Sequence, residues 1–148
     1  MLFVLDASVA ACWAFADEEH PLASYALRIL PDSEARAPAL WWFELRNTLI
    51  VGERRGRIQP GDTVTFLAWI LQAPMVLDRS PDESALLFLA RRHKLTVYDA
   101  AYLELAGRLN APLATLDKKL AAAALAETSR SCRPHDLRPP LRPRRHAG

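Results

Sequence analysis

The sequence has little of three features on which large protein classes depend: glycine-rich motifs, cysteine patterns and long apolar runs. Its five glycines form neither a GxGxxG nor a GxxxxGK[ST] motif, which argues against dinucleotide-binding and phosphate-loop enzymes. Cys12 and Cys132 form no CxxC or Cys/His pattern, so we expect no structural zinc and a reducing compartment. No apolar run reaches the ~18 residues that a membrane-spanning helix requires. These absences predict a cytoplasmic protein that does not associate with membranes.

Charge is distributed unevenly along the chain. Of 19 basic and 17 acidic residues, six arginines and one aspartate fall in residues 128–148, which leaves 13 bases against 16 acids in residues 1–127. The C-terminal stretch also contains four of the eleven prolines and few large apolar side chains. We therefore predict one globular domain over residues 1–127 and a basic, Pro/Arg-rich tail over residues 128–148 that is poorly ordered. Contact with nucleic acid and simple solvation both remain open for this tail.

Strand-like and helix-like segments alternate along residues 1–127. Short apolar runs predict strands at residues 2–5, 35–38, 75–78 and 112–116. Apolar residues at helical spacing, with start and stop signals, predict helices at residues 8–16, 20–30, 40–55, 59–73, 80–93, 98–109 and 118–126. The pattern at Ser80-Pro81-Asp82-Glu83 is that of a capping box with Ser80 as the cap. This alternation predicts an α/β fold, a three-layer α/β/α domain around a central, mainly parallel sheet of four to five strands.

Four carboxylates occupy positions that share one edge of such a sheet. Asp6 and Asp117 each follow a predicted strand, and ligands of open α/β sheets bind outside the carboxyl ends of the strands. Asp99 lies in the first turn of a predicted helix. Glu44 lies among Trp, Phe and Leu residues, where an unpaired charge is costly.

Each of these acids also has a simpler structural explanation. Asp6 and Asp117 have the positions of helix N-caps. Asp99 lies three residues after Thr96, as in a capping arrangement, and Glu44 can reach solvent near a helix N-terminus. These explanations do not account for the occurrence of all four acids at one edge of the sheet, because four neighbouring carboxylates repel one another. Oxygen-only ligands suit Mg²⁺ or Mn²⁺ rather than zinc, so the set favours metal-assisted phosphoryl chemistry.

Four short segments carry a resemblance to a known family. They are LDAS at residues 5–8, WFELRN at 42–47, VYDAAYLELA at 97–106 and ATLD at 114–117. In this order they resemble the PIN-domain nucleases, most closely the VapC-type toxins of bacterial toxin–antitoxin modules, over about residues 2–125. The resemblance implies a PIN-like domain. Family members often add a further strand after the last helix, whereas no run in residues 127–148 resembles one.

The resemblance also implies roles for individual residues. It assigns an acidic quartet that catalyses the reaction and holds one or two Mg²⁺ or Mn²⁺ ions: Asp6, Glu44, Asp99 and Asp117. It assigns a set that bonds to the acids, to metal-bound water or to the substrate: Ser8, Asn47 and Thr115. Nine basic residues are candidates for contacts with substrate phosphates: Arg46, Arg54, Arg55, Arg57, Arg91, Arg92, Lys94, Lys118 and Lys119.

The function implied by the resemblance is that of a metal-dependent endoribonuclease, the toxin of a VapBC-type module, which hydrolyses RNA phosphodiester bonds with a metal-activated water. The implied partners are the RNA substrate, a cognate antitoxin of VapB type and a second copy of the chain in a homodimer. An aromatic cluster suits either an antitoxin groove or core packing: Trp41, Trp42, Phe43, Phe66, Trp69 and Ile70. The alternative hypothesis is a catalytically inactive PIN-like module that binds RNA or protein while the acids cap helices.

Overall fold

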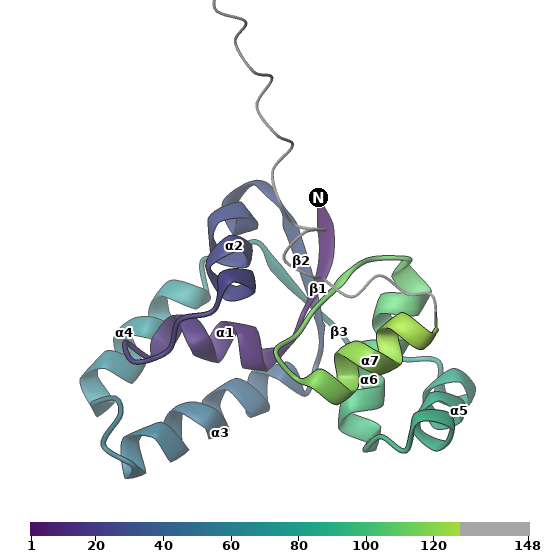
Figure 1. Ribbon diagram of the computed structural model, residues 1–148. Coiled ribbons are helices and arrows are strands. Elements are labelled where there is room, and N and C mark those ends of the chain that lie inside the picture. The colour runs from purple at the N-terminus through teal and green to yellow at the C-terminus, as the bar shows by residue number, and fades with distance from the viewer. Residues whose placement is uncertain (128–148) are drawn as a thin grey trace, which may run out of the picture.

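The structure, a computed structural model, describes residues 1–127 and consists of a parallel sheet with helices on both faces (Figure 1). The predicted tail, residues 128–148, lies outside the described residues. Among the described residues, no helix combines the length and the apolar character needed to cross a membrane.

Within residues 1–127, four strands form the sheet, in the order β3-β2-β1-β4, and all neighbouring pairs are parallel. They are β1 (Leu2–Leu5), β2 (Glu34–Pro38), β3 (Met75–Asp78) and β4 (Leu113–Ala114). The register places Leu2 opposite Glu34 and Leu5 opposite Ala114. β1 is an inner strand whose residues 3–5 are fully buried, which explains its uninterrupted apolar run. The predicted α/β fold with a parallel sheet is confirmed, although the last strand is shorter than the predicted residues 112–116.

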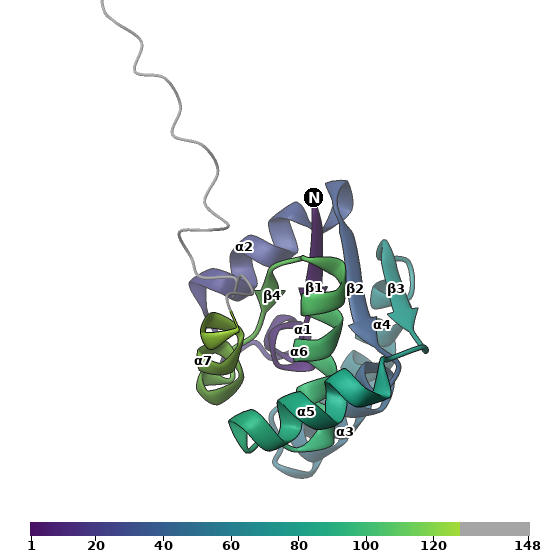
Figure 2. The same cartoon turned by 90° about the vertical axis from the view of Figure 1, so that its right-hand side faces the viewer.

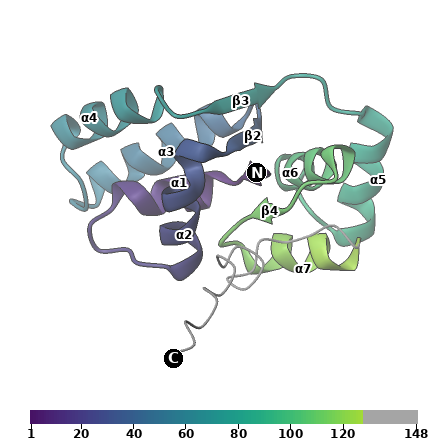
Figure 3. The same ribbon diagram turned by 90° about the horizontal axis from the view of Figure 1, so that it is seen from above.

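Helices cover the sheet in two layers (Figures 2 and 3). One layer contains α1 (Ala7–Ala14), α2 (Pro21–Ile29), α3 (Trp41–Arg54) and α4 (Pro60–Ile70), with a short 3-10 turn, η1 (Leu30–Asp32), after α2. The other layer contains α5 (Glu83–His93), α6 (Val97–Leu109) and α7 (Lys118–Ala126). Within this second layer, α6 packs directly on β1, β2 and β4, while α5 and α7 pack on α6. The helix that carries Asp99 is therefore the one most closely bound to the sheet.

An ion-pair network holds α6 against the end of β3. Arg108 donates to Asp78 Oδ2 at 2.6 Å and to Glu104 Oε1 at 2.7 Å. Glu104 is 3% exposed and also accepts a hydrogen bond from the backbone N–H of Asp82. Because the buried carboxylate has both a charged and a neutral donor, its desolvation is compensated. The network fixes the C-terminal half of α6 relative to the connection from β3 to α5.

The start of α5 differs from its prediction. Asp82, rather than Ser80, is the N-cap, and its side chain accepts a hydrogen bond from the backbone N–H of Ala85 at 2.9 Å. Ser80 lies outside the helix, in the connection between β3 and α5. The helix therefore begins at Glu83.

Helix α5 lies at the periphery of the domain. None of its residues is fully buried, and Phe88 in its middle is 55% exposed. Its close contacts are with α6. Lys94 ends the helix in the left-handed conformation, and its carbonyl accepts a hydrogen bond from Lys119 Nζ at 2.7 Å.

A close approach at Gly52 in α3 generates a stability prediction. A Cβ atom added there would lie 2.3 Å from Cε1 of the buried Phe15 ring. We expect Gly52→Ala to lower the free energy of unfolding by about 1–3 kcal/mol, because overpacking outweighs the gain of up to about 1 kcal/mol in helix propensity. Urea denaturation measures this change. Gly61→Ala in α4 is the matched control, since nothing lies within 4 Å of its added Cβ, and it should be neutral or stabilising. Equal stability of the two variants would contradict the predicted clash.

Candidate active site

The candidate site lies at the carboxyl edge of the sheet, where several chain segments meet. Asp6 directly follows β1, and residues 115–117 directly follow β4. Glu44 lies in the first turn of α3, which begins three residues after β2 ends, and Asp99 lies in the first turn of α6. The parallel topology therefore brings together residues that are up to 111 positions apart in the sequence, as between Asp6 and Asp117.

Asp6 is the most buried of the four acids, with 7% of its surface exposed. Its Oδ2 atom accepts hydrogen bonds from Ser8 Oγ at 2.7 Å and from Thr115 Oγ1 at 2.6 Å. Its side chain makes no capping hydrogen bond to α1, although Asp6 has the N-cap position. The N-cap position alone therefore does not account for Asp6, whose short hydrogen bonds are to the two hydroxyls.

The two hydroxyls are oriented by the backbone. Ser8 Oγ accepts a hydrogen bond from the Leu116 N–H at 3.1 Å, and Thr115 Oγ1 accepts one from the Asp117 N–H at 3.0 Å. A backbone N–H only donates, so each hydroxyl directs its single proton at Asp6. This agrees with the predicted roles of Ser8 and Thr115 as hydroxyls that bond to a carboxylate.

Glu44 is half-buried and is held by Tyr102. The Tyr102 hydroxyl donates to Glu44 Oε1 at 2.6 Å, which joins α3 to α6 across the site. Tyr102 is fully buried, and no role was predicted for it from the sequence. The sequence signal for a role of Tyr102 at the site is its position three residues after Asp99, which places both on the same helix face.

Asn47 does not orient Glu44 in this structure. Its side chain is exposed and makes no hydrogen bond among residues 1–127. Tyr102 has the orienting role instead. Contact between Asn47 and the substrate stays a prediction.

Asp99 has a carboxylate without a structural partner. Thr96 Oγ1 accepts the backbone N–H of Asp99 at 3.1 Å, so the predicted capping arrangement exists, but it uses only the Asp99 backbone. Within residues 1–127, the half-buried Asp99 carboxylate makes no hydrogen bond or ion pair. Any residue except proline at position 99 could supply this backbone N–H. The cap therefore does not explain why the residue at this position is an aspartate.

Asp117 has a different environment from the other three acids. Its Oδ1 atom accepts a hydrogen bond from the Leu120 N–H at 3.0 Å, and the residue is exposed. The N-cap explanation of Asp117 is therefore confirmed. Its backbone is nevertheless joined to the Asp6 network through Thr115, so it lies beside the site with its side chain turned to α7.

Three of the acids interact electrostatically. Burial raises the pKa of Asp6, against the opposing effect of its two hydroxyl donors, and the charge of Asp99 raises it further. Burial also raises the pKa of Glu44, and the charges of Asp6 and Asp99 contribute in the same direction. The pKa of the Tyr102 hydroxyl is raised by burial and then by the charge of Asp6. Asp6, Glu44 and Asp99 therefore form one negatively charged cluster.

The chemistry of this cluster fits a hard divalent cation. All of its donors are carboxylate oxygens, and no basic side chain in residues 1–127 forms an ion pair with Asp6, Glu44, Asp99 or Asp117. In their present conformations, however, no three acidic, His or Cys side chains of the described residues converge closely enough to hold one ion. The donor set fits Mg²⁺ or Mn²⁺, and ligation of one ion by all four acids requires their side chains to move closer together.

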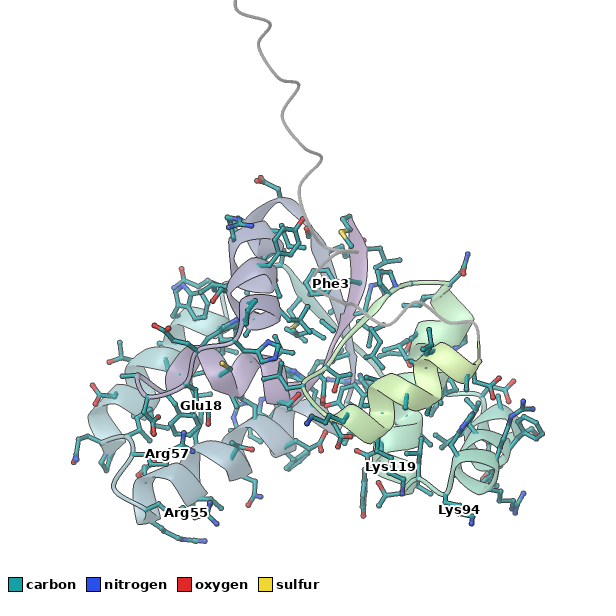
Figure 4. The ribbon with its side chains drawn as sticks, viewed as in Figure 1. Phe3, Glu18, Arg55, Arg57, Lys94 and Lys119 are labelled. Atoms are coloured by element: carbon teal, nitrogen blue, oxygen red, sulfur yellow. The ribbon has the colours of Figure 1, made fainter. Side chains whose placement is uncertain are left out.

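Three of the nine candidate basic residues have partners away from the acids. Arg57 pairs with Asp17 and Glu18 near the far end of α3, and Lys119 bonds to the end of α5 (Figure 4). Arg92 pairs with Glu127. Arg46 lies two residues after Glu44 and forms no ion pair within the described part of the chain.

The aromatic cluster is not a single groove. Trp41 and Ile70 are each 4% exposed and belong to the core, whereas Trp42 and Phe43 are exposed. Trp69 packs edge-to-face on Trp13 at 6.2 Å. It lines a separate groove of about 420 Å³ with Leu27, Leu30, Pro31 and residues 72–74. These residues precede β2 and β3, so the groove lies at the opposite end of the sheet from the acids.

Comparisons with known proteins agree with the fold. The profile of the family described as PIN domain matches residues 3–126. Among solved structures, the crystal structure of PAE2754 from Pyrobaculum aerophilum matches with a TM-score of 0.63 and 23% sequence identity, over 83% of this chain and 87% of that chain. At this identity, the likeness to PAE2754 shows the fold alone. No curated protein matches the chain.

The raised pKa of Asp6 generates a pH prediction for the metal-free protein. Above pH 3.8, folded Asp6 retains a proton that the unfolded chain has lost, so the free energy of unfolding decreases as pH rises through the folded pKa. Asp6→Asn keeps an oxygen to accept both hydroxyls but cannot titrate. We expect this variant to lose less stability than wild type between pH 4 and neutral pH, measured by urea denaturation in EDTA. An identical decrease in both proteins would contradict the assignment.

Thr115→Val tests the hydroxyl contribution separately. It preserves the shape of the side chain but removes a donor that lowers the pKa of Asp6. The Asp6 carboxyl should titrate at a higher pH in this variant than in wild type, as followed by NMR. A pKa that is unchanged or lowered would show that the Thr115 hydroxyl does not stabilise the charged form.

Proposed function

Because the chain belongs to the PIN domain family, whose members are generally nucleases, we propose that it is a metal-dependent endoribonuclease that hydrolyses RNA phosphodiester bonds. We further propose that it is the toxin of a VapBC-type toxin–antitoxin module. The four sequence segments that resemble VapC-type toxins support this narrower assignment.

The observation that carries the proposal is the Asp99 carboxylate. It is half-buried, has no hydrogen bond or ion pair within residues 1–127, and adds negative charge to Asp6 and Glu44. A carboxylate in such a place opposes folding unless a cation compensates it. Perturbed acids gathered at the carboxyl edge of an α/β sheet are typical of a functional site.

We propose Asp6, Glu44, Asp99 and Asp117 as the residues that hold Mg²⁺ or Mn²⁺, which PIN domains typically use. When bound, such an ion supplies positive charge beside the scissile phosphate and lowers the pKa of water. The chain's own contribution is orientation: Ser8 and Thr115 hold the Asp6 carboxylate, and Tyr102 holds that of Glu44. Fixed ligands of this kind reduce the reorganisation that binding would otherwise require.

One observation favours the alternative function, a catalytically inactive module that binds RNA or protein. Asp117 caps α7, and no three potential ligands in residues 1–127 converge on one point. An inactive module needs neither metal nor carboxylate charge. Metal binding therefore separates the two functions.

We also propose a cognate antitoxin and a second copy of the chain as protein partners in the cytoplasm. Exposed apolar side chains on and after α4 support a protein interface, with Val64 68% and Leu71 72% exposed. The free thiol of Cys12 is compatible with a reducing compartment. Sedimentation of the purified chain, alone and coexpressed with the protein encoded beside it, tests both partners.

The proposed activity predicts a sharp effect of Asp99→Asn. Incubation of total bacterial RNA with wild type and Mg²⁺ or Mn²⁺ should give discrete fragments that EDTA abolishes. Asp99→Asn should lower the cleavage rate at least about 100-fold, since even indirect partners of metal ligands contribute roughly 10- to 100-fold. Its free energy of unfolding in EDTA should be equal to or higher than that of wild type, because within residues 1–127 the carboxylate makes no hydrogen bond or ion pair and its charge repels Asp6 and Glu44.

Two further measurements complete this test. Asp62→Asn, in the first turn of α4, is the control for loss of an exposed acid and should cleave at the wild-type rate. Mn²⁺ should raise the melting temperature of wild type but not that of Asp99→Asn. Wild-type protein that neither binds Mn²⁺ nor cleaves RNA would be the inactive module instead.

A further inference from the structure

Helices α5 and α6 lie side by side (Figure 2), and a groove of about 510 Å³ is open between them. We call it the α5–α6 groove. Its walls come from three parts of the chain: Asp82, Ala85, Phe88 and Leu89 at α5; Glu104, residues 106–108 and residues 110–111 at α6; and Glu127 after α7. These residues of α6 belong to its C-terminal half, whereas Asp99 lies in its first turn. The groove is therefore separate from the acid cluster.

The α5–α6 groove presents an aromatic ring beside carboxylates. Phe88 is 55% exposed, so its ring is accessible from solvent. Arg108 is bonded to Glu104 at 2.7 Å and to Asp78 at 2.6 Å, so two carboxylates compensate its single positive charge. Asp82 accepts only a backbone N–H at the start of α5 among the bonds described above.

The charge balance of the groove is negative. The lining residues and their direct ion-pair partners include four acids and two arginines: Asp78, Asp82, Glu104, Glu127, Arg92 and Arg108. His93 also bonds to Glu127, at 2.6 Å, and adds at most one further positive charge. The balance therefore stays negative in either protonation state of His93.

This combination indicates the chemistry of the occupant. A phosphate group would meet a net negative charge, so the groove is unfavourable for RNA. A purely apolar segment would bury carboxylates without replacing their water, which is also unfavourable. A segment of arginine and proline supplies cations for the acids and flat apolar rings for Phe88, and Pro-rich segments characteristically bind beside aromatic side chains.

The sequence of residues 128–148 has this composition, with six arginines and four prolines against one acid. Its first residue follows Glu127, which is part of the groove wall. The 11 residues of α5 extend over about 16 Å, whereas 21 residues of Pro-rich chain can span up to about 65 Å. The C-terminal stretch therefore begins at the groove and is several times longer than the helix beside it.

We propose that residues 128–148 dock in the α5–α6 groove of their own chain, with prolines against Phe88 and arginines beside the groove acids. This docking covers the outer face of α5 and does not depend on the nuclease function. A short tether holds a segment at an effective concentration on the order of millimolar, so even weak contacts keep the groove occupied. A separate basic peptide lacks this advantage.

Paramagnetic broadening in the full chain tests the docking. Gly148→Cys in a Cys132→Ser background provides a thiol for a nitroxide label, while Cys12 is 5% exposed and protected from labelling. We expect the amide signals of residues 85–89 and 106–111 to broaden strongly, and those of α4 to stay sharp. Raising the salt concentration from about 0.1 M to about 1 M should reduce the broadening, because the Debye length falls from about 10 Å to about 3 Å.

Two phenylalanine variants identify the groove as the docking site. Phe88→Ala should lose most of the broadening at residues 85–89. Phe43→Ala on α3 is the matched control, because Phe43 is 70% exposed and does not line the groove. It should keep the broadening of the parent protein. Unchanged chemical shifts in the sheet show that each variant is folded.

Three results would overturn the proposal. The first is broadening at α5 that is no stronger than at α4, as expected for a solvated or RNA-binding tail. The second is broadening that Phe88→Ala leaves unchanged. The third comes from mixing isotope-labelled chain that has no nitroxide with unlabelled chain that carries it: broadening in this mixture equal to that in the doubly labelled chain would place the tail on a second copy. RNA cleavage by the same preparation tests the nuclease function separately, since the groove contains none of the four acids.

Discussion

The structure depends on one buried negative charge, the carboxylate of Asp6 at the end of β1. A carboxylate that is 7% exposed is costly unless donors replace water, and the Ser8 and Thr115 hydroxyls do so. Each hydroxyl in turn satisfies a backbone N–H of residues 116–117. One carboxylate oxygen therefore fixes the start of α1 relative to the connection between β4 and α7. The same group defines the junction of three elements and the centre of the acid cluster.

This junction places stability and function in opposition. The hydroxyl donors favour the charged form of Asp6, whereas burial and the neighbouring Asp99 favour the neutral form. The pKa of Asp6 is therefore raised overall. Glu44 shows the same balance, since burial outweighs the hydrogen bond from Tyr102. Of the two buried acids in residues 1–127, Asp6 has no basic partner. Elsewhere the buried acid Glu104 is fully paired with Arg108, as a purely structural carboxylate is expected to be.

The sequence was most informative where the determining contacts are local. The cap of α7 at Asp117 and the backbone cap at Thr96 involve residues three positions apart, so pattern alone predicts them. The alternation of strands and helices likewise predicts the parallel sheet. Even locally, two patterns can compete: Asp82 rather than Ser80 caps α5, and its side chain accepts the Ala85 N–H.

Contacts between distant residues were less accessible to sequence reasoning. The bond from Tyr102 to Glu44 spans 58 positions and depends on how α3 and α6 approach each other, so Asn47, one turn away, was the more obvious partner for Glu44. Trp41 lies in the core and its neighbour Trp42 at the surface, and this difference also depends on how distant elements pack. Adjacent helical residues point about 100° apart, and only the packing of α3 determines which one faces inward.

The peripheral position of α5 has a consequence for motion. None of its residues is fully buried, and it is held by packing on α6 and by bonds to Glu127 and Lys119, so its separation from the domain exposes less apolar surface than the opening of α6 would. Its amide hydrogens therefore belong to a cooperative unit that exchanges with solvent before those of α6. Since α6 itself packs directly on β1, β2 and β4, Asp99 and Tyr102 keep their positions during such openings. The domain thus separates a fluctuating outer layer from a rigid inner one, and the acids belong to the rigid layer.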